Sequence, residues 1–257
     1  MLTPPEIARS LLAAGESKAR LPLGKMLLLA ILAGAYIALA GVGATAAAVT
    51  VESGSLAKLL SACVFPAGLS MVILAGSELF TGNCLMVMAL LEHRITPAQL
   101  LRNWLTVYLG NAVGGAAVAA LAVYSHTASL FGDGLARSMV SIAESKAALG
   151  AGDAFLRGVL CNFLVCLAVW MAAASKRAEG KVIALFFPIL LFVLCGYEHC
   201  IANLYYLPAG AFAAAEYGME TTLTLAGCLK NLAAVTLGNL VGGAALGVGY
   251  RFAYFKE

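Results

Sequence analysis

Uncharged and strongly apolar segments recur six times along the 257 residues of this chain. A helix needs about 20 apolar residues to cross the hydrocarbon core of a bilayer. With 62% hydrophobic and 11% charged residues, the chain has too little polar surface to cover a soluble globule. We therefore expect an all-α membrane protein with six transmembrane helices in a single domain, residues 1–257. The uncharged runs cover residues 26–51, 59–77, 103–132, 158–175, 182–197 and 231–250.

Two of these runs belong to longer apolar stretches that a glutamate interrupts, Glu78 in residues 59–91 and Glu198 in residues 182–207. Glycine and polar residues crowd around both glutamates, which predicts two broken helices near the middle of the membrane. Irregular backbone at that depth is tolerated only where it is buried in protein or lines an aqueous cavity. We therefore expect both breaks to face one pore. The crowded segments are residues 76–83 and 196–203.

Ionisable side chains inside these apolar stretches need a reason to be there, because each costs about 2.5 to 3.5 kcal/mol at the bilayer centre. We expect Glu78 and Glu198 to be structural and to accept hydrogen bonds from backbone N–H groups that the helix breaks leave free. Direct contact with a solute is the alternative. Asn83 and Asn203 are assigned the same structural role. For His199, the one histidine within a span, we expect a functional role rather than a satisfied core imidazole.

An internal repeat relates the two halves of the chain. Residues of the third run recur 128 positions later in the sixth, and residues of the second recur 120 positions later in the fifth. Three crossings turn the second unit over, so units 26–132 and 133–257, the latter beginning with a linker, predict an inverted repeat. Chance similarity between glycine-rich helices is the alternative. The first set is Arg102 (answered by Lys230), Asn103, Gly110, Asn111, Gly114 and Gly115; the second is Gly76, Glu78 and Asn83, with Pro66 answered by Pro188.

The distribution of lysine and arginine predicts that both termini lie in the cytoplasm. With that orientation, eleven of the sixteen basic residues fall in cytoplasmic segments, as the positive-inside rule requires. Lys230, at the start of the sixth span, is unassigned. The cytoplasmic set is Arg9, Lys18, Arg20, Lys25, Arg94, Arg102, Lys176, Arg177, Lys181, Arg251 and Lys256; the external set is Lys58, Arg137, Lys146 and Arg157.

Residues 1–25 contain no apolar segment of the kind that precedes a cleavage site, and we expect them to form an amphipathic helix. Thr3 and Glu6 have the spacing of a capping box, and Pro4 suits the first helical turn. The apolar face, which includes Leu11 and Leu12, predicts a helix lying along the membrane interface. The seven cysteines form no CxxC pair, so we interpret them as packing residues rather than metal ligands or disulfide partners.

Three stretches resemble signature segments of the formate/nitrite transporter family: residues 74–82, 158–168 and 196–203. The resemblance extends over essentially the whole chain. It implies an aquaporin-like protomer in a homopentamer, with one pore per protomer for formate, nitrite or hydrosulfide, in a bacterial cytoplasmic (inner) membrane. Residues 204–210 look more like formate or hydrosulfide members than nitrite members, so formate is the expected substrate.

The resemblance also implies roles for individual residues. The pore histidine of the family falls on His199 and the threonine that hydrogen-bonds it on Thr81. The neighbouring constriction residues fall on Leu79 and Phe80, in a loop expected to move as a gate. The resemblance further places the vestibule lysine at Lys146 and the pore asparagine at Asn162.

Other classes of protein fit the sequence poorly. Nothing resembles a basic cluster interleaved with aromatic residues that would bind nucleic acid. An aquaporin-like channel for neutral solutes would carry an Asn-Pro-Ala motif, which is absent. No nucleophile and base pair or facing histidines indicate an enzyme, a cofactor or a metal. Two mechanisms stay open: passage of a neutral acid after protonation, or passage of an anion beside a charged His199.

Overall fold

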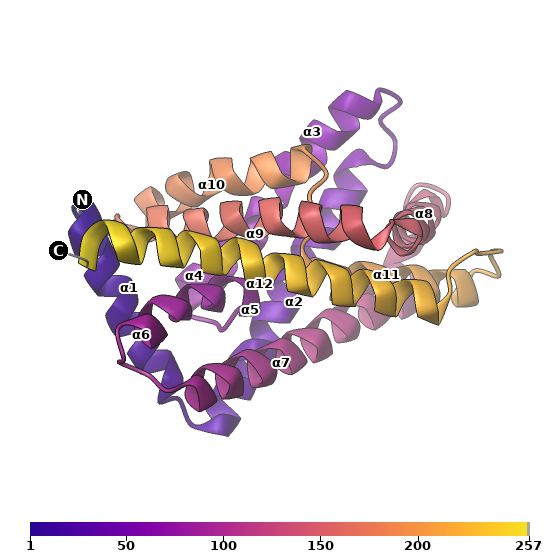
Figure 1. Cartoon of the computed structure of the whole chain (residues 1–257). Coiled ribbons are helices and arrows are strands. Elements are labelled where there is room, and N and C mark those ends of the chain that lie inside the picture. The colour runs from indigo at the N-terminus through magenta and orange to yellow at the C-terminus, as the bar shows by residue number, and fades with distance from the viewer. Residues whose placement is uncertain (256–257) are drawn as a thin grey trace.

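The computed structural model describes residues 1–255, and over that range every regular element is a helix (Figure 1). Lys256, which the topology prediction assigns to the cytoplasm, lies outside the described residues. In chain order the elements are α1 (Pro4–Ala19), α2 (Leu23–Ala48), α3 (Gly54–Val64), α4 (Pro66–Ala75), α5 (Phe80–Asn83), η1 (Cys84–Met86), α6 (Val87–Leu91), α7 (Pro97–Tyr124), η2 (Thr127–Ser129), α8 (Gly134–Ala148), α9 (Ala151–Ala173), α10 (Ala178–Leu194), α11 (Cys200–Glu216) and α12 (Leu225–Phe255).

Within residues 1–255, five helical stretches are long and apolar enough to cross a membrane: α2, α3 together with α4, α7, α9 and α12. The remaining expected crossing, the fifth in chain order, corresponds to α10 and α11, which are 17 residues each because the chain breaks between them. The third run was expected to extend to Gly132, but α7 ends at Tyr124. The reason is that His126 and Phe131 adopt left-handed backbone angles, which a helix cannot continue through.

The two halves of the chain run in opposite directions through the molecule. In Figure 1, α7 and α12 cross the bundle in opposite senses, and both chain ends lie at the end that carries α1, while α8 lies at the far end. The most extensive helix pairs are α9 with α12 and α2 with α7, the same pair in each half. The inverted repeat expected from the sequence is therefore present.

Glycines allow each of these pairs to pack at very short range. A Cβ added at Gly114 of α7 would overlap the carbonyl oxygen of Ile31 on α2, and one added at Gly242 of α12 would overlap that of Val159 on α9. All four residues obey the 128-residue offset. Membrane helices commonly use small residues to bring their backbones together in this way, so the repeated glycines have a repeated packing role.

Both broken helices are present at the positions that the sequence predicts. Helix α4 ends at Ala75 and the chain becomes helical again at Phe80, whereas α10 ends at Leu194 and α11 begins at Cys200. A glycine with a left-handed backbone turns the chain just after each helix ends: Gly76, with φ of 77°, follows α4, and Gly196, with φ of 69°, follows α10. A Cβ at either would meet nothing within 4 Å, so glycine is needed there for its left-handed backbone rather than for space.

The residues expected as a linker at the start of the second unit contain a helix, α8, that corresponds to α1. Helix α1 shifted by 128 positions falls on α8, and each lies at the end of the molecule where its own unit begins. The apolar face of α1 is buried against the protein, with Ile7 at 3% and Leu12 at 9% exposure. The backbone N–H of Thr3 donates to Glu6 at 2.7 Å, which forms the expected capping box. A position of α1 along the membrane interface stays a prediction.

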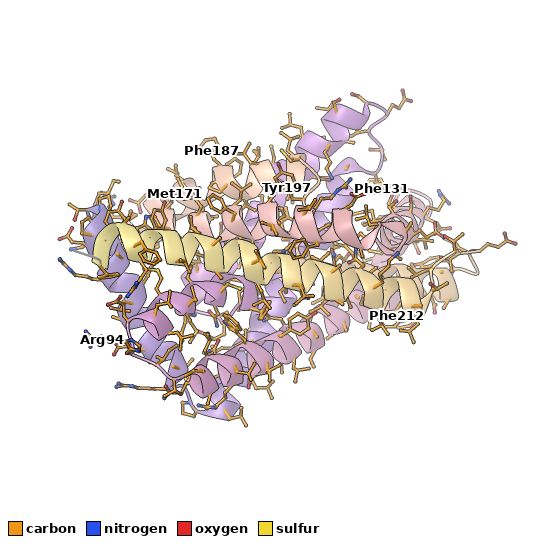
Figure 2. All side chains as sticks on the ribbon, in the orientation of Figure 1. Arg94, Phe131, Met171, Phe187, Tyr197 and Phe212 are labelled. Carbon is orange, nitrogen blue, oxygen red and sulfur yellow. The ribbon has the colours of Figure 1, made fainter. Side chains whose placement is uncertain are left out.

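The flanks of the bundle are apolar and exposed, as a lipid-facing surface requires. Leu109 on α7 and Phe187 on α10 are 62% and 60% exposed, and Figure 2 shows Phe187 projecting away from the bundle. The buried interior, in contrast, holds a set of polar side chains, all 5% exposed or less: Glu78, Thr81, Asn83, Asn103, Asn111, Asn162, Glu198, His199, Asn203, Asn231 and Asn239. Most of these residues gather around the two breaks.

Candidate functional site

A cavity lies beside each of the two helix breaks. The α8-side cavity has a volume of about 350 Å³, and the α1-side cavity about 600 Å³. His199 lines the first and Leu79 the second, and these residues occupy matching places in the two breaks because they are 120 positions apart. The charged lining residues are Lys58, Lys146, Arg157 and Glu198 in the α8-side cavity and Lys18, Glu78, Lys176 and Lys181 in the α1-side cavity.

His199 connects the two breaks through its ring nitrogens. It is the N-cap of α11, where its Nδ1 accepts the backbone N–H of Ala202 at 3.0 Å. A neutral ring with Nδ1 as acceptor carries its hydrogen on Nε2. Nε2 lies 3.0 Å from the hydroxyl oxygen of Thr81, in the other break, and therefore donates to it. The pairing of His199 with Thr81 that the family resemblance implies is present.

The expected constriction residues Leu79 and Phe80 have different surroundings. Leu79 lines the α1-side cavity, but Phe80 lines neither cavity. The ring of Phe80 packs edge-on against Tyr108, with ring centroids 5.1 Å apart, and against Trp104 at 6.4 Å. Phe80 therefore holds the loop against α7 in this structure, because the aromatic residues of that helix surround it.

Two other phenylalanines border the α8-side cavity beside His199. The rings of Phe65 and Phe192 meet edge-on with centroids 5.7 Å apart, and Phe192 stacks on the imidazole of His199 at 5.8 Å. Both line the cavity. They were not among the expected site residues, because an isolated phenylalanine in an apolar run carries no signal that distinguishes it from a lipid-facing or core residue.

Asn162, expected in the pore, lies behind the Thr81 loop rather than in either cavity. It is fully buried and its amide donates to the carbonyl oxygens of Thr81, at 3.2 Å, and Asn239, at 2.7 Å. The thiol of Cys166 also donates to the Thr81 carbonyl, at 3.3 Å. Both contacts fix the backbone from which the Thr81 hydroxyl reaches His199.

Lys146 belongs to a buried polar network at the α8-side break. Its ammonium donates to both oxygens of Glu198, at 2.9 and 3.0 Å, and lies 5.3 Å from the ring centre of Tyr206. Asn203 donates to Glu198 at 2.7 Å and to Asn231 at 2.8 Å. The side chain of Lys146 is 15% exposed and lines the cavity, so its charge faces the space beside His199.

Lys18 belongs to the equivalent network at the other break and was not among the expected site residues. Its ammonium donates to Glu78 at 2.7 Å, and Asn83 donates to Glu78 at 2.8 Å and to Asn103 at 2.9 Å. The signal that would have found it is the repeat itself, because Lys18 precedes Lys146 by the same 128 positions that relate Asn103 to Asn231. Asn83 and Asn203 have the structural position that we expected.

The expectation that Glu78 and Glu198 accept backbone N–H groups freed by the breaks was wrong. Their carboxylates bind lysine and asparagine side chains instead. Two asparagines satisfy the free backbone. Asn111 accepts the N–H of Phe80 at 3.0 Å and donates to the carbonyls of Ala30 and Glu78; Asn239 accepts the N–H of Cys200 at 2.9 Å and donates to those of Gly158 and Glu198. A neutral amide suits this role better, since it both donates and accepts.

Within residues 1–255, no group of three or more histidine, cysteine, aspartate or glutamate side chains is placed to hold a metal ion. The polar groups at the breaks that border the cavities include His199, the Thr81 hydroxyl and the two lysine–glutamate pairs. Such an arrangement offers cationic cavities separated by a buried polar link.

Comparison with known proteins extends this interpretation to the whole chain. Residues 5–253 match the sequence profile of a family described as formate/nitrite transporter. A probable formate transporter of Methanothermobacter thermautotrophicus is 38% identical, with 99% of this chain and 98% of that protein covered. The formate channel FocA of Haemophilus influenzae is 39% identical, with 86% of this chain and 83% of that protein covered.

Solved structures agree with the sequence comparison. An ion channel of the FNT family superposes with a TM-score of 0.86 at 33% identity, covering 96% of this chain and 98% of the other. A pentameric formate channel with formate bound superposes with a TM-score of 0.80 at 32% identity, covering 91% and 98%. Profile, relatives and architecture thus agree along nearly the full length, and the chain is a multi-pass membrane protein that belongs to the formate/nitrite transporter family.

Proposed function

We propose that this protein is a homopentameric channel that passes formate together with a proton, through a pore in each protomer. The observation that carries the proposal is the hydrogen bond between His199 and Thr81, which joins the two helix breaks between two cationic cavities. Formate and the pentamer are taken from the relatives, which include formate channels and a pentameric formate channel with formate bound.

The charges of both cavities support an anionic solute. Each cavity is lined by three cationic side chains and one glutamate, which gives a net charge of +2 (three minus one) on either side of the polar link. A cleft lined by one sign of charge raises the local concentration of the opposite ion. At the α8-side cavity we assign the attraction of the anion mainly to Lys146. Its ammonium binds Glu198, the residue that precedes His199 in the chain.

The energy of the crossing favours a neutral acid over a bare anion. Moving a carboxylate-sized ion into a medium of low dielectric costs on the order of 20 kcal/mol in the Born limit, and several kcal/mol after relaxation. Protonating an acid whose pKa resembles that of aspartic acid, about 3.9, costs roughly 4 kcal/mol at pH 7. Apolar side chains such as Leu79 and Phe65 cannot offset the cost of desolvating the anion or of protonating it. Because protonation costs less than transfer of the bare anion, formate crosses more easily as the neutral acid.

The hydrogen bonds of His199 limit where the proton comes from. A neutral imidazole has no proton to spare, so the proton that formate takes up must come from the cavity with it. His199 relays that proton only if Nδ1 releases the N–H of Ala202 and a proton binds there, with Nε2–H passing to the substrate beside Thr81. If His199 were permanently charged, Nδ1 would carry a hydrogen that faces the backbone N–H of Ala202, and two donors would oppose each other. For this reason we favour protonation of the substrate over a mechanism in which a charged His199 stabilises the anion.

Side-by-side flux measurements in liposomes test the proposal. Purified protein is reconstituted, and the initial fluxes of formate, nitrite and hydrosulfide are compared at equal concentration together with the pH change inside the liposomes. We expect formate to move fastest and to carry about one proton per molecule, above the leak of protein-free liposomes. Faster nitrite or hydrosulfide flux would replace formate as the substrate, and formate flux without proton movement would favour the anionic mechanism.

A further inference from the structure

The α1-side cavity contains a buried hydroxyl group that no side chain or backbone group of residues 1–255 satisfies. Ser77 is 8% exposed and its Oγ has no hydrogen-bond partner within that range, although its own backbone N–H is bonded to Val72. Ser77 lines the cavity beside Glu78 and Leu79. Buried hydroxyls are nearly always hydrogen-bonded, because burying one without a partner costs free energy. This serine is therefore positioned to bond something that occupies the cavity.

The surroundings of Ser77 select an anion as that occupant. Lys18 directs one hydrogen bond to Glu78, and an ammonium group has three donors, so two remain for the cavity. Lys176 and Lys181 come from the junction of α9 and α10, line the same cavity and form no ion pair within 4 Å in residues 1–255.

The acidic groups near this cavity are already bonded. Glu78 is occupied by Lys18 and Asn83. Glu6 on α1 feels the charge of Lys176, but its carboxylate accepts the backbone N–H and the hydroxyl of Thr3. Those two bonds, and to a smaller extent Lys176, hold the pKa of Glu6 below its usual value. Neither carboxylate accepts a hydrogen bond from the Ser77 hydroxyl in this structure.

We propose that the α1-side cavity is a binding station for a small carboxylate, with the Ser77 hydroxyl as a direct donor and the ammonium groups of Lys18, Lys176 and Lys181 as its cationic surroundings. The station lies immediately before Leu79 and the polar link, so a formate held there is the next molecule to cross. The inference rests on the proposed function and adds a residue that determines affinity on one side of the pore.

The two sides of the pore differ at this position. The residue that corresponds to Ser77 in the second break, 120 positions later, is Tyr197, which is only partly buried in the α8-side cavity. Lys146 is also more fully engaged than Lys18, because it donates to both oxygens of Glu198. The station therefore makes the affinity for formate higher when formate approaches from the α1 side.

Membrane vesicles of both orientations test the station. Right-side-out and inside-out vesicles expose opposite sides of the pore, and the formate concentration that gives half-maximal initial flux is measured in each. Ser77→Ala should raise this concentration about tenfold from the α1 side, the loss expected for one hydrogen bond to a charged group, and by less than twofold from the other side. Ser77→Thr, which keeps the hydroxyl, should restore the wild-type value.

Ser70→Ala is the matched control. Ser70 lies on α4, but its hydroxyl already donates a hydrogen bond to the Pro66 carbonyl at 3.0 Å. It should leave both concentrations unchanged. An unchanged value for Ser77→Ala on the α1 side, or an equal increase on both sides, would overturn the station while leaving formate transport itself intact.

Failure of the proposed substrate is recognised separately. If wild-type vesicles pass nitrite but not formate, the proposed function falls and the same comparison with nitrite tests Ser77. If no flux is measurable, formate binding is tested instead by the thermal stabilisation that formate gives to the detergent-solubilised protein. Wild type and Ser70→Ala should be stabilised and Ser77→Ala much less, whereas equal stabilisation of all three contradicts the station.

Discussion

His199 illustrates how much one side chain does at the residue scale. The same ring caps α11 through Nδ1, reaches Thr81 through Nε2 and stacks on Phe192, so every polar atom and one face are in use. This explains how an ionisable residue is kept in an apolar span, and it also places that residue between the cavities. A packing role and a transport role are therefore not exclusive for His199, and only a functional measurement separates them.

The His199→Asn variant provides this measurement. Asparagine keeps polarity and an acceptor for the N–H of Ala202, but its amide cannot take up and release a proton as an imidazole can. We expect coupled movement of proton and formate to be lost. Wild-type flux should rise as external pH falls, whereas the variant should show only the dependence of free formic acid leak, measured in protein-free liposomes. Wild-type flux, pH profile and proton coupling in the variant would reduce His199 to a packing residue.

Lys146 is expected to act through its charge. Lys146→Glu should lower formate flux at low concentration by at least tenfold, because it reverses the charge of a cavity that attracts anions. Lys146→Arg should largely preserve flux, since a guanidinium can still bind both oxygens of Glu198. Lys146→Gln removes the charge without placing two carboxylates together, and it separates loss of attraction from misfolding. Equal flux in all of these proteins would exclude Lys146 from the mechanism.

At the scale of the elements, the broken helices depend on one amide each. Asn111 from α7 and Asn239 from α12 each bond an N–H and a carbonyl at a break and one further carbonyl on a neighbouring helix. In hydrocarbon no water replaces a missing partner, so each of these bonds is worth more than it would be at a protein surface. The glycines at 76 and 196 permit the turns, but the asparagines keep the turned backbone buried.

Asn111→Leu should therefore destabilise the protein strongly. The change leaves the N–H of Phe80 and the carbonyl of Glu78 without their side-chain partner and removes a second donor from the carbonyl of Ala30, at a cost of about 3 kcal/mol or more in total. The midpoint of thermal unfolding in detergent should fall clearly, and Asn239→Leu should behave in the same way because its bonds are equivalent. Leu109→Ala, on the exposed face of α7, is the control and should have little effect. A wild-type midpoint for Asn111→Leu would mean that the breaks are satisfied otherwise.

The whole molecule is organised by its inverted repeat. The N-terminus and the C-terminal end of α12 lie at one end of the bundle, where α1 lines the adjacent cavity, and α8 lines the other cavity at the opposite end (Figure 1). Each half of the chain thus contributes a lysine, a glutamate and three asparagines to its own break: Lys18, Glu78, Asn83, Asn103 and Asn111 in the first half, and Lys146, Glu198, Asn203, Asn231 and Asn239 in the second. The symmetry is incomplete where function requires a difference: His199 in one break corresponds to Leu79 in the other.

Labelling of single cysteines and native mass measurement test orientation and assembly together. We expect both termini in the cytoplasm, because eleven of sixteen basic residues fall on that side, and a mass of five protomers, as in the related pentameric formate channel. Labelling is compared between positions near the N-terminus and in the loop after α7, which should react from opposite sides. An external C-terminus would contradict the predicted topology, and any other mass would contradict the pentamer.

Local properties of the chain were readable from the sequence, because they depend on neighbouring residues. Apolar run lengths predicted the spans, a glycine beside an intramembrane glutamate predicted each break, and the offsets of 128 and 120 predicted the inverted repeat. A functional role for His199 was predicted because it is the one histidine within a span and lies beside a break, and its partner Thr81 was implied by the family resemblance. None of these inferences required knowing which helices touch.

Contacts between distant residues were decided only by the tertiary structure. Lys18 and Glu78 are 60 positions apart, and Asn111 and Glu78 are 33 apart, so no local pattern indicates that they bond. For the same reason the sequence assigned the glutamates the wrong partners and gave no indication that Phe80 packs on Tyr108 of α7. The lack of a hydrogen-bond partner for the Ser77 hydroxyl is likewise known only from the structure, because it depends on the positions of all the neighbouring groups.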